Sequence, residues 1–252
     1  MEKLSELQSW YKWKRPTSIP YPNIWHRFTS KTKDGKVYNI KIVDLSADRF
    51  EEIMEFSKEY FFSREPICVS SKVVEDERTM HNLQSKHRAI LQQHTSIVAV
   101  LDEDVPKPEI VGMLKLLVAS KEDDPIPKPQ IPGNFMPIKD KLFEKLEKNH
   151  DPFDIFNTDK VFREYGLCVK PGYEGLNIGY NILFAVEKLA KAFHIKASVI
   201  TANSIQSQII ADKIGYKTWN EIVYNEFKDN QGRVVFPVEG TKSIKLMAIE
   251  FI

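Results

Sequence analysis

The chain has 252 residues, of which 42% are hydrophobic, and its 36 lysines and arginines nearly balance its 35 aspartates and glutamates. A chain of this length and composition can bury a large core, which excludes disorder on the scale of the whole chain. The formal net charge of +1 creates no strong overall field for nucleic acid or an anionic membrane, so we expect neither as a partner.

The N-terminal sequence, MEKLSELQSWYKWKRP, is too polar for a secretory signal, and no apolar run is long enough to cross a membrane. Only two cysteines occur, Cys68 and Cys168. This number is typical of a protein that keeps its thiols free. We therefore expect a soluble, cytoplasmic protein.

The first predicted elements are an arm, a strand and a helix. Residues 1–36 mix aromatic and basic residues with prolines, and we expect an irregular N-terminal arm whose rings pack on a single domain formed by residues 37–252. Residues 36–45 alternate apolar and polar positions, which predicts a strand. Ser46 can cap a following helix, which is expected to end before Pro66.

The next segments predict a helix, a hairpin and a loop. A helix is predicted over 74–94, and the apolar runs at 96–102 and 109–120 predict an antiparallel pair. Residues 123–137 contain too many prolines for a helix or an inner strand. They predict either a lid or binding loop, or a surface excursion. Residues 139–150 predict another helix.

The C-terminal half alternates strands and helices. The predicted elements are a strand at 162–170, a helix at 177–193, a strand at 196–201, a helix at 204–214 that ends at Gly215, and two closing strands around 228–233. This order predicts a mixed α/β fold with one parallel crossover near its middle.

Residues 165–180 read YGLCVKPGYEGLNIGY and join a strand to a helix through a turn that contains glycine. Such a turn directs unpaired backbone N–H groups toward one point, where a phosphate binds well. Glu174 and Asn177 are unusual at this place, because a phosphate-binding loop favours a base and a glycine. A dinucleotide-binding interpretation is weak, because the third glycine and an acidic partner for the ribose are missing.

Two separate motifs carry a resemblance to a known family. Residues 162–216 resemble the acetyl-CoA core of the GCN5-related N-acetyltransferases (GNATs), and EYFFSREPI, residues 59–67, resembles the FF-x-D-E-P-L segment of insect arylalkylamine N-acetyltransferases. The ending GRVVFPVEGTKSIKLMAIEFI resembles the insect group too. The resemblance covers residues 38–252 and implies a mixed sheet of about seven strands, with flanking helices and a splayed central strand pair.

The resemblance implies acetyl-CoA as cosubstrate and no metal. A bulged strand would pair with the pantetheine arm, and the loop after it would hold the pyrophosphate. The residues implied are Leu167, Cys168, Val169, Gly175, Leu176, Asn177, Ile178, Gly179, Tyr180 and Ser204. The family loop usually reads Arg/Gln-x-x-Gly-x-Gly/Ala, of which only Gly179 matches here. Glu174 would weaken binding about tenfold if it faced the phosphates, unless Lys170 offsets it.

The resemblance also implies catalytic residues. Glu65 matches the glutamate that the insect family uses as general base, directly or through water, although Arg64 replaces the aspartate before it. Ser207 matches a serine that the insect group uses at the departing thiolate, and Asn203 occupies the partner position four residues earlier. Ser204, beside Asn203, is equally suited to cap the helix.

Backbone amides at the bulge would stabilise the oxyanion, namely the N–H of Val169 with or without that of Cys168. Cys168 is either a covalent nucleophile or a small buried strand residue, and direct transfer in the family favours the second interpretation. His81, His87 and His94 lack the spacing of a zinc motif and are expected on a solvated or core-edge helix.

The function expected is transfer of an acetyl group from acetyl-CoA to the amine of a small, arylalkylamine-like molecule, by direct attack in a ternary complex. We expect a monomer or a weak dimer. The alternative is a non-catalytic, acyl-CoA-binding GNAT homologue with a degenerate phosphate loop.

Overall fold

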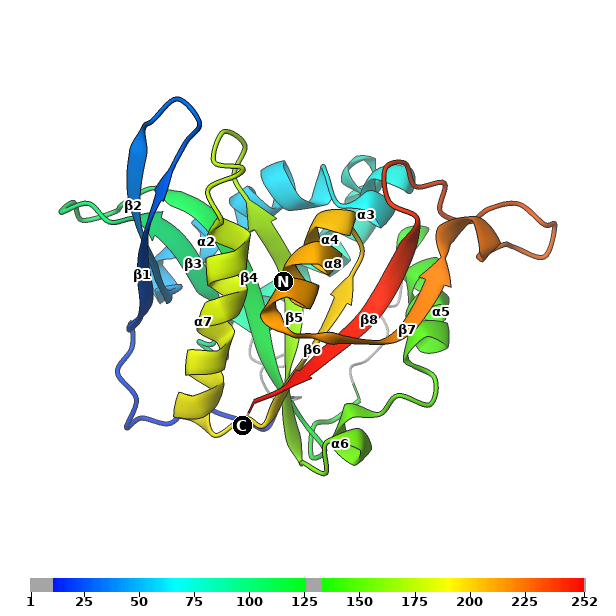
Figure 1. Cartoon of the computed structure of the whole chain (residues 1–252). Coiled ribbons are helices and arrows are strands. Elements are labelled where there is room, and N and C mark those ends of the chain that lie inside the picture. The colour runs from blue at the N-terminus through cyan, green and yellow to red at the C-terminus, as the bar shows by residue number, and fades with distance from the viewer. Residues whose placement is uncertain (1–10, 126–132, 252) are drawn as a thin grey trace.

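A computed structural model describes residues 11–125 and 133–251 (Figure 1). One sheet of eight strands crosses the molecule in the order β1-β2-β3-β4-β5-β6-β8-β7. Its strands are β1 (Ile24–Lys31), β2 (Val37–Asp44), β3 (Ile97–Leu101), β4 (Ile110–Ser120), β5 (Lys160–Val169), β6 (Ala197–Ala202), β7 (Lys217–Val223) and β8 (Ser243–Glu250). Only β5 and β6 pair in parallel. The predicted mixed α/β class with one central crossover is confirmed, with eight strands in place of about seven.

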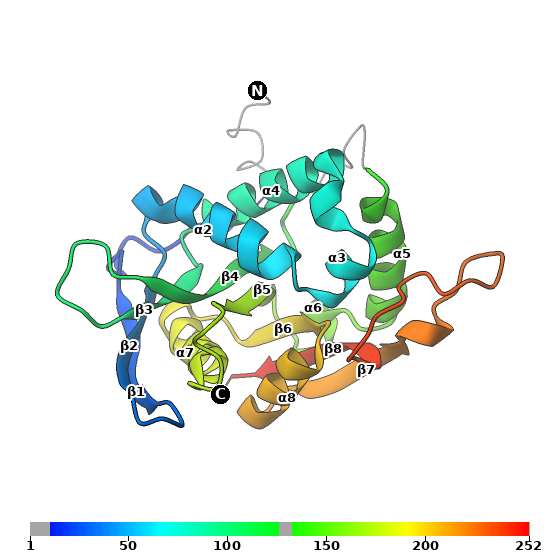
Figure 2. The ribbon, with the colours of Figure 1, turned by 90° about the horizontal axis from the view of Figure 1, so that it is seen from above.

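Helices cover both faces of the sheet. They are α2 (Phe50–Phe56), α3 (Pro66–Ser70), α4 (Glu77–Leu91), α5 (Phe135–Glu147), α6 (Pro152–Ile155), α7 (Ile178–Phe193) and α8 (Ile205–Ile214). Figure 2 shows α7 and α8 on one face, and α2, α3 and α4 on the other. A π-helix, η2 (Ser57–Phe62), continues α2 toward α3.

The crossover helix α7 follows directly from its sequence. Ile182, Leu183, Val186 and Leu189 recur at helical spacing and are fully or almost fully buried against the sheet. The core on this face extends from α7 across β2, β3, β4 and β5. The crossover therefore fixes the start of α7 beside the end of β5.

Strands β5 and β6 pair over only three positions, Phe162–Glu164 on one strand and Ser198–Ile200 on the other. On the other side of β5, the register against β4 shifts between Met113 and Lys115, which marks a bulge. Gly166 lies in the bulge with φ of 71°, and a Cβ there would come 3.3 Å from Lys115 Cε. Beyond Glu164 the two central strands therefore diverge.

Three parts of the chain differ from the sequence prediction. The predicted irregular arm contains an ordered edge strand, β1, and we propose that its residues belong to the same domain as 37–252. The two C-terminal strands pair as predicted, but β8 starts only at Ser243, and a single isolated bridge, Lys228 to Val234, flanks the predicted turn. Helices α3 and α6 were not predicted, and residues 126–132 of the proline-rich loop lie outside the described residues.

Asp44 joins the N-terminal segment to the sheet. Its buried carboxylate accepts hydrogen bonds from Arg15 Nη2 at 2.7 Å, Trp25 Nε1 at 2.7 Å and the Asn23 backbone N–H at 2.8 Å. Three residues that precede β2, namely Arg15, Asn23 and Trp25, thus share one buried charge. Arg15, Asn23 and Trp25 are consequently held against the sheet by Asp44.

We predict that Asp44→Asn lowers the free energy of unfolding by about 3 to 5 kcal/mol, because it leaves the Arg15 guanidinium buried without its counter-charge. Urea denaturation measures this loss. The matched control is Asp48→Asn. The exposed carboxylate of Asp48 lies 3.9 Å from Lys107 Nζ, and its replacement should leave the denaturation midpoint close to that of wild type. Equal effects of the two substitutions would contradict the anchoring role.

Candidate active site

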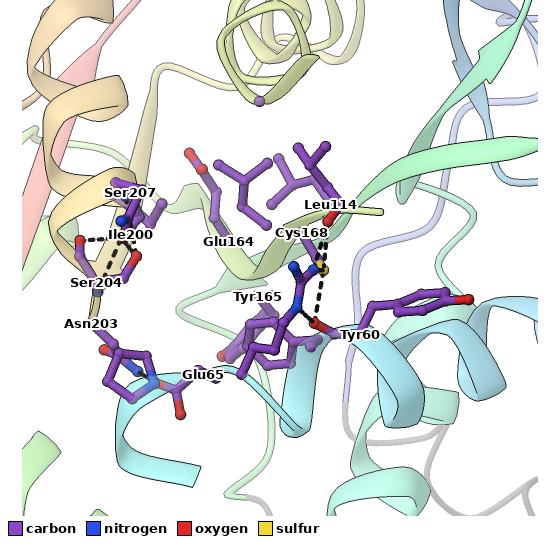
Figure 3. Close-up of a pocket in the computed structure, with 18 of the residues that line it drawn as sticks. Tyr60, Glu65, Leu114, Glu164, Tyr165, Cys168, Ile200, Asn203, Ser204 and Ser207 are labelled. Atoms are coloured by element: carbon purple, nitrogen blue, oxygen red, sulfur yellow. Dashed lines mark hydrogen bonds between the residues drawn. The ribbon is translucent and has the colours of Figure 1, made fainter. Parts of the chain in front are cut away.

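A cavity of about 640 Å³ lies at the divergence of β5 and β6 and reaches both faces of the sheet (Figure 3). On one face it is bounded by residues of α7 and α8, and on the other by residues of η2, α3, α4 and α5. All the predicted site residues except Leu176 line it: Glu65, Leu167, Cys168, Val169, Gly175, Asn177, Ile178, Gly179, Tyr180, Asn203, Ser204 and Ser207.

Leu176 is the exception because its side chain is only 1% exposed and packs in the core between α7 and the sheet. An apolar side chain at this turn gains more from burial than from contact with a charged ligand. The Leu176 side chain therefore does not face the cavity, and the prediction that Leu176 binds the cofactor rests on its backbone alone.

The end of β5 presents backbone groups to the cavity. The Lys170 N–H donates to Val111 O at 2.9 Å. In an antiparallel pair, hydrogen-bonded and non-hydrogen-bonded residues alternate along the strand, so the N–H and C=O of Val169 point away from β4. The same alternation directs the Cys168 backbone toward Met113. Of the two amides predicted at the bulge, only that of Val169 faces the gap.

Cys168 is a buried, free thiol. Burial raises its pKa, and its Sγ donates to Tyr60 O at 3.3 Å. A thiol that is neutral and hydrogen-bonded is a weak nucleophile. This environment favours the structural interpretation of Cys168.

The loop before α7 has the shape expected for an anion site. Asn177 is the N-cap residue in the left-handed conformation, with φ of 56°, and its side chain makes no capping hydrogen bond. Gly175 also has positive φ, 77°, and a Cβ there would meet nothing within 4 Å. The first N–H groups of the 16-residue helix lack intrahelical partners and border the cavity at Ile178, Gly179 and Tyr180.

Glu174 is turned away from the start of the helix. Its Oε2 accepts from the Gly172 N–H at 2.7 Å, and its Oε1 lies 3.6 Å from Arg64 Nη1. Lys170, which the sequence suggested as the counter-charge, instead pairs with Glu109 at 2.6 Å. The two departures from the family motifs, Arg64 and Glu174, therefore compensate each other electrostatically.

Arg64 also contacts the end of β5. Its Nη2 donates to Val169 O at 2.6 Å and reaches Cys168 Sγ at 3.5 Å, while its Nε donates to Tyr60 O at 2.7 Å. The guanidinium thus links η2, the end of β5 and Glu174 in the loop before α7. From the sequence, Arg64 is only a departure from the family motif, because its partners on β5 lie more than a hundred positions away along the chain.

Glu65 caps α3 and is 7% exposed. Its Oε2 accepts from the Cys68 N–H at 2.8 Å, and its Oε1 accepts from Asn203 Nδ2 at 2.5 Å. Burial raises the pKa of Glu65, and the hydrogen bonds from Cys68 and Asn203 oppose this effect in part. A carboxylate with a raised pKa is a stronger base than an exposed one.

Asn203 positions Glu65. Its backbone C=O accepts from Tyr224 OH at 2.8 Å, and its side-chain Oδ1 is buried without a hydrogen-bond partner in the described chain. The residue therefore offers one acceptor at the cavity in addition to its bond with Glu65.

Ser204 and Ser207 form a capping box at the start of α8. Ser204 Oγ accepts from the Ser207 N–H at 3.2 Å, and Ser207 Oγ donates to Ser204 O at 2.8 Å. Ser204 thus serves as the N-cap that its sequence position allows. Ser207 borders the cavity, and its hydroxyl donates its proton to the hydrogen bond with the Ser204 carbonyl.

Glu164 is a buried carboxyl that sequence analysis did not select. It lies on the α7 face of β5, and its Oε1 accepts from the hydroxyls of Ser198 and Tyr216, while Oε2 is buried without a partner in the described chain. Burial raises its pKa to about 7. Figure 3 shows Glu164 directed toward α7. The signal in the sequence was an acid on a strand face that is otherwise buried.

Lys115 is a second charged residue within an apolar strand. It is completely buried, donates to Ser57 Oγ at 2.7 Å, and has its pKa lowered to about 7 by burial. The Lys115 side chain packs beside Gly166 at the bulge and does not line the cavity.

Residues 11–125 and 133–251 contain no cluster of three or more His, Cys, Asp or Glu side chains suited to a metal. In the same part of the chain, every helix is too short or too polar to cross a membrane.

Solved structures resemble the chain closely in fold. The Aedes aegypti (yellow fever mosquito) protein designated arylalkylamine N-acetyltransferase 7 matches with a TM-score of 0.85 and 26% identity, over 96% of this chain and 100% of that chain. Arylalkylamine N-acetyltransferase 2 of the same mosquito matches with a TM-score of 0.72 and 18% identity, over 84% of this chain and 99% of that chain. A polyamine N-acetyltransferase of Drosophila melanogaster matches with a TM-score of 0.69 and 16% identity, over 84% of this chain and 99% of that chain. No protein-family model matches the chain, and no curated sequence matches it.

The splayed strands, the bulge and the crossover helix define a GNAT fold, and the solved structures agree with that class. The chain resembles the insect arylalkylamine N-acetyltransferases, as its two motifs predict. Its structural neighbours support an acetyltransferase of this fold.

The pKa of Glu164 generates a prediction for stability. An acid whose folded pKa is raised from 4.5 to about 7 destabilises the fold as pH rises through this window. Wild type should therefore lose about 2 to 3 kcal/mol relative to Glu164→Gln between pH 5 and pH 8. Glutamine keeps an acceptor for Ser198 and Tyr216. Urea denaturation at both pH values tests this, and parallel pH profiles would contradict it.

Proposed function

We propose that the chain transfers an acetyl group from acetyl-CoA to the amine of a small, arylalkylamine-like molecule, by direct attack in a ternary complex. The observation that carries this proposal is the buried carboxylate of Glu65 at a cavity that connects both faces of the sheet beside the Val169 amide. Such a cavity allows one substrate to enter from each face.

The residues present fit acetyl-CoA. The N–H groups at the start of α7 suit a diphosphate, and the exposed loop glycines leave room for it. The C=O of Val169 faces the gap and suits the pantetheine arm once Arg64 releases it, which leaves the Val169 N–H for the thioester oxygen. Bound acetyl-CoA supplies an activated thioester carbonyl, and the residues of the chain bind it and move protons around it.

Glu65 acts as the base in this proposal. An alkylammonium with a pKa of about 10.4 costs about 4.6 kcal/mol to deprotonate at pH 7, so the amine needs a base close by. The raised pKa of Glu65 suits proton abstraction, directly or through one water, and Asn203 holds the carboxylate in place.

The remaining charges are stabilised at β5 and α8. The Val169 N–H donates to the oxyanion that forms when the amine nitrogen bonds to the carbonyl carbon. When the carbon–sulfur bond breaks, the Ser207 hydroxyl donates a hydrogen bond to the departing thiolate, which takes up the proton that the amine nitrogen loses. This step requires Ser207 Oγ to release Ser204 O, a bond of 2.8 Å in the structure.

A second function is binding of acyl-CoA without catalysis, and one observation favours it. The Val169 C=O, which faces the gap, already accepts a hydrogen bond from Arg64 Nη2 at 2.6 Å. A pantetheine arm that used this carbonyl would have to displace Arg64. Turnover of any amine excludes the purely binding function.

We predict that Glu65→Gln lowers kcat/KM for amines by about 10²-fold to 10⁴-fold, because the base is lost while the shape of the site is kept. The dissociation constant for acetyl-CoA, measured by calorimetry, should stay within about twofold. Glu59→Gln, an exposed glutamate outside the cavity, is the control and should behave as wild type.

The pH profile adds a second measurement of the same role. Because the pKa of Glu65 is raised from 4.5, the acidic limb of kcat/KM in wild type should lie above that value and disappear in Glu65→Gln. Full activity of the variant would remove Glu65 from the mechanism.

The Arg64–Glu174 pair predicts a coupled effect on acetyl-CoA binding. Arg64→Ala should weaken binding about tenfold, because Glu174 then faces the phosphates without its counter-charge. The double variant Arg64→Ala/Glu174→Ala should recover most of this loss in calorimetry. If the double variant binds as weakly as Arg64→Ala, charge compensation is not the role of Arg64.

A further inference from the structure

Lys115 is a buried basic residue that the steps described so far do not use. Its side chain is completely buried within the apolar strand β4, and its ammonium group donates to Ser57 Oγ at 2.7 Å. No carboxylate in residues 11–125 and 133–251 forms an ion pair with it. A buried charge without a counter-charge destabilises a fold, so its presence beside a cavity points to a function.

The ammonium group of Lys115 lies directly behind the bulge in β5. Lys115 is opposite Tyr165 in the ladder between β4 and β5. Its Cε and Nζ lie 3.3 and 3.5 Å from the position that a Cβ on Gly166 would take, which is one residue closer to the gap. Gly166 lines the cavity and has no side chain. On this side, the backbone of the bulge therefore separates the ammonium group from the cavity.

Aromatic rings enclose the ammonium group on the η2 side. Lys115 Nζ lies 5.6 Å from the ring centroid of Phe61 and 5.8 Å from that of Phe62. Both rings line the cavity. They attract a cation and exclude water from it, so the charge acts through a medium of low dielectric constant.

Two groups that line the cavity sense the charge of Lys115. Burial, first, and Lys115, second, lower the pKa of His87. Burial raises the pKa of Cys168, and Arg64 and Lys115 oppose this effect. The imidazole and the thiol are both neutral, so neither of them cancels the field of Lys115 in the cavity.

The two carboxyl groups that line the cavity do not pair with this charge. Glu164 is directed toward α7, on the other face of the sheet, and Glu65 caps α3. Burial lowers the pKa of Lys115 to about 7, and the charge interaction that opposes burial is with Cys168. The field of Lys115 is therefore available to a ligand.

Resting on the proposed acetyltransferase function, we propose that Lys115 stabilises the negative charge that develops on the thioester oxygen when the amine attacks. The Val169 N–H is the direct hydrogen-bond donor, and Lys115 acts through its electric field from behind the bulge. Lys115 touches neither substrate, forms no bond and transfers no proton. One charge about 10 Å away, in a medium with a dielectric constant of about 20, changes a rate by about tenfold.

Lys115→Met tests the role by its dependence on pH. At pH 6, kcat/KM for tyramine should be about tenfold lower in the variant than in wild type, with free thiol release as the readout. Lys115 loses its proton near pH 7, so the ratio of wild type to variant should fall toward one by pH 8.5. The ratio removes the titration of the amine and of Glu65, which both proteins share.

The infrared stretch of the thioester carbonyl reports the same field without turnover. With acetyl-CoA labelled with carbon-13 at the carbonyl, the stretch in wild type should lie at a lower frequency at pH 6 than at pH 8.5. A positive charge near the oxygen polarises the carbonyl bond and weakens it. In Lys115→Met the stretch should be the same at both pH values.

Urea denaturation distinguishes this role from structural support. Lys115→Met replaces an unpaired buried charge by an apolar side chain of similar length, so the denaturation midpoint should stay unchanged or rise. Joint loss of stability and activity would overturn the proposal. Lys121→Met is the matched control, because Lys121 is exposed just after β4 and lies 3.3 Å from Asp154. It should keep the wild-type activity at every pH.

The remaining results separate this role from the proposed function. If wild type and Lys115→Met acetylate tyramine with a constant ratio, and their carbonyl stretches respond alike to pH, the role of Lys115 is wrong while the acetyltransferase function stands. If no amine is acetylated although acetyl-CoA binds, both proposals are overturned.

Discussion

The divergence of β5 and β6 beyond Glu164 is the constraint on which the site depends. Three paired positions hold the strands together, and the bulge at Gly166 then turns the last residues of β5 away. Because a backbone whose hydrogen bonds are not used by a neighbouring strand must bond elsewhere, Val169 is available to a ligand. The same gap lets the cavity pass from the α7 face to the α4 face, so two substrates can meet from opposite sides.

Several charged side chains around this gap follow one physical rule, which is that a buried charge is stabilised by an opposite charge. Glu174 has Arg64, Asp44 has Arg15, and Glu147 has Arg163. Among the described residues, buried side-chain atoms without a hydrogen-bond partner include Glu164 Oε2 and Asn203 Oδ1 at the cavity, and Arg15 Nε and His94 Nδ1 away from it. Unpaired groups at a cavity are more informative about ligands than the pairs that surround it.

Local sequence patterns predicted the elements that position the site. They did not predict the contacts between residues that lie far apart in the sequence. The 3.6-residue period of α7 and the apolar runs of β4 and β5 place the crossover within a few residues of its observed bounds. Strand β1 was missed because its order depends on Asp44, which binds residues far earlier in the chain. Likewise, Glu65, Ser207 and the loop could be selected from motifs, whereas the Arg64–Glu174 pair arises only when the chain folds.

The central claim is that main-chain amides at the start of α7 hold the diphosphate of acetyl-CoA, although the loop carries an acid. A crystal structure of the chain with saturating acetyl-CoA tests it most directly. The account predicts the diphosphate within hydrogen-bond distance of the N–H groups between Gly175 and Tyr180, with Glu174 still paired to Arg64. A diphosphate bound elsewhere, or Glu174 turned into the start of the helix in its place, would contradict it.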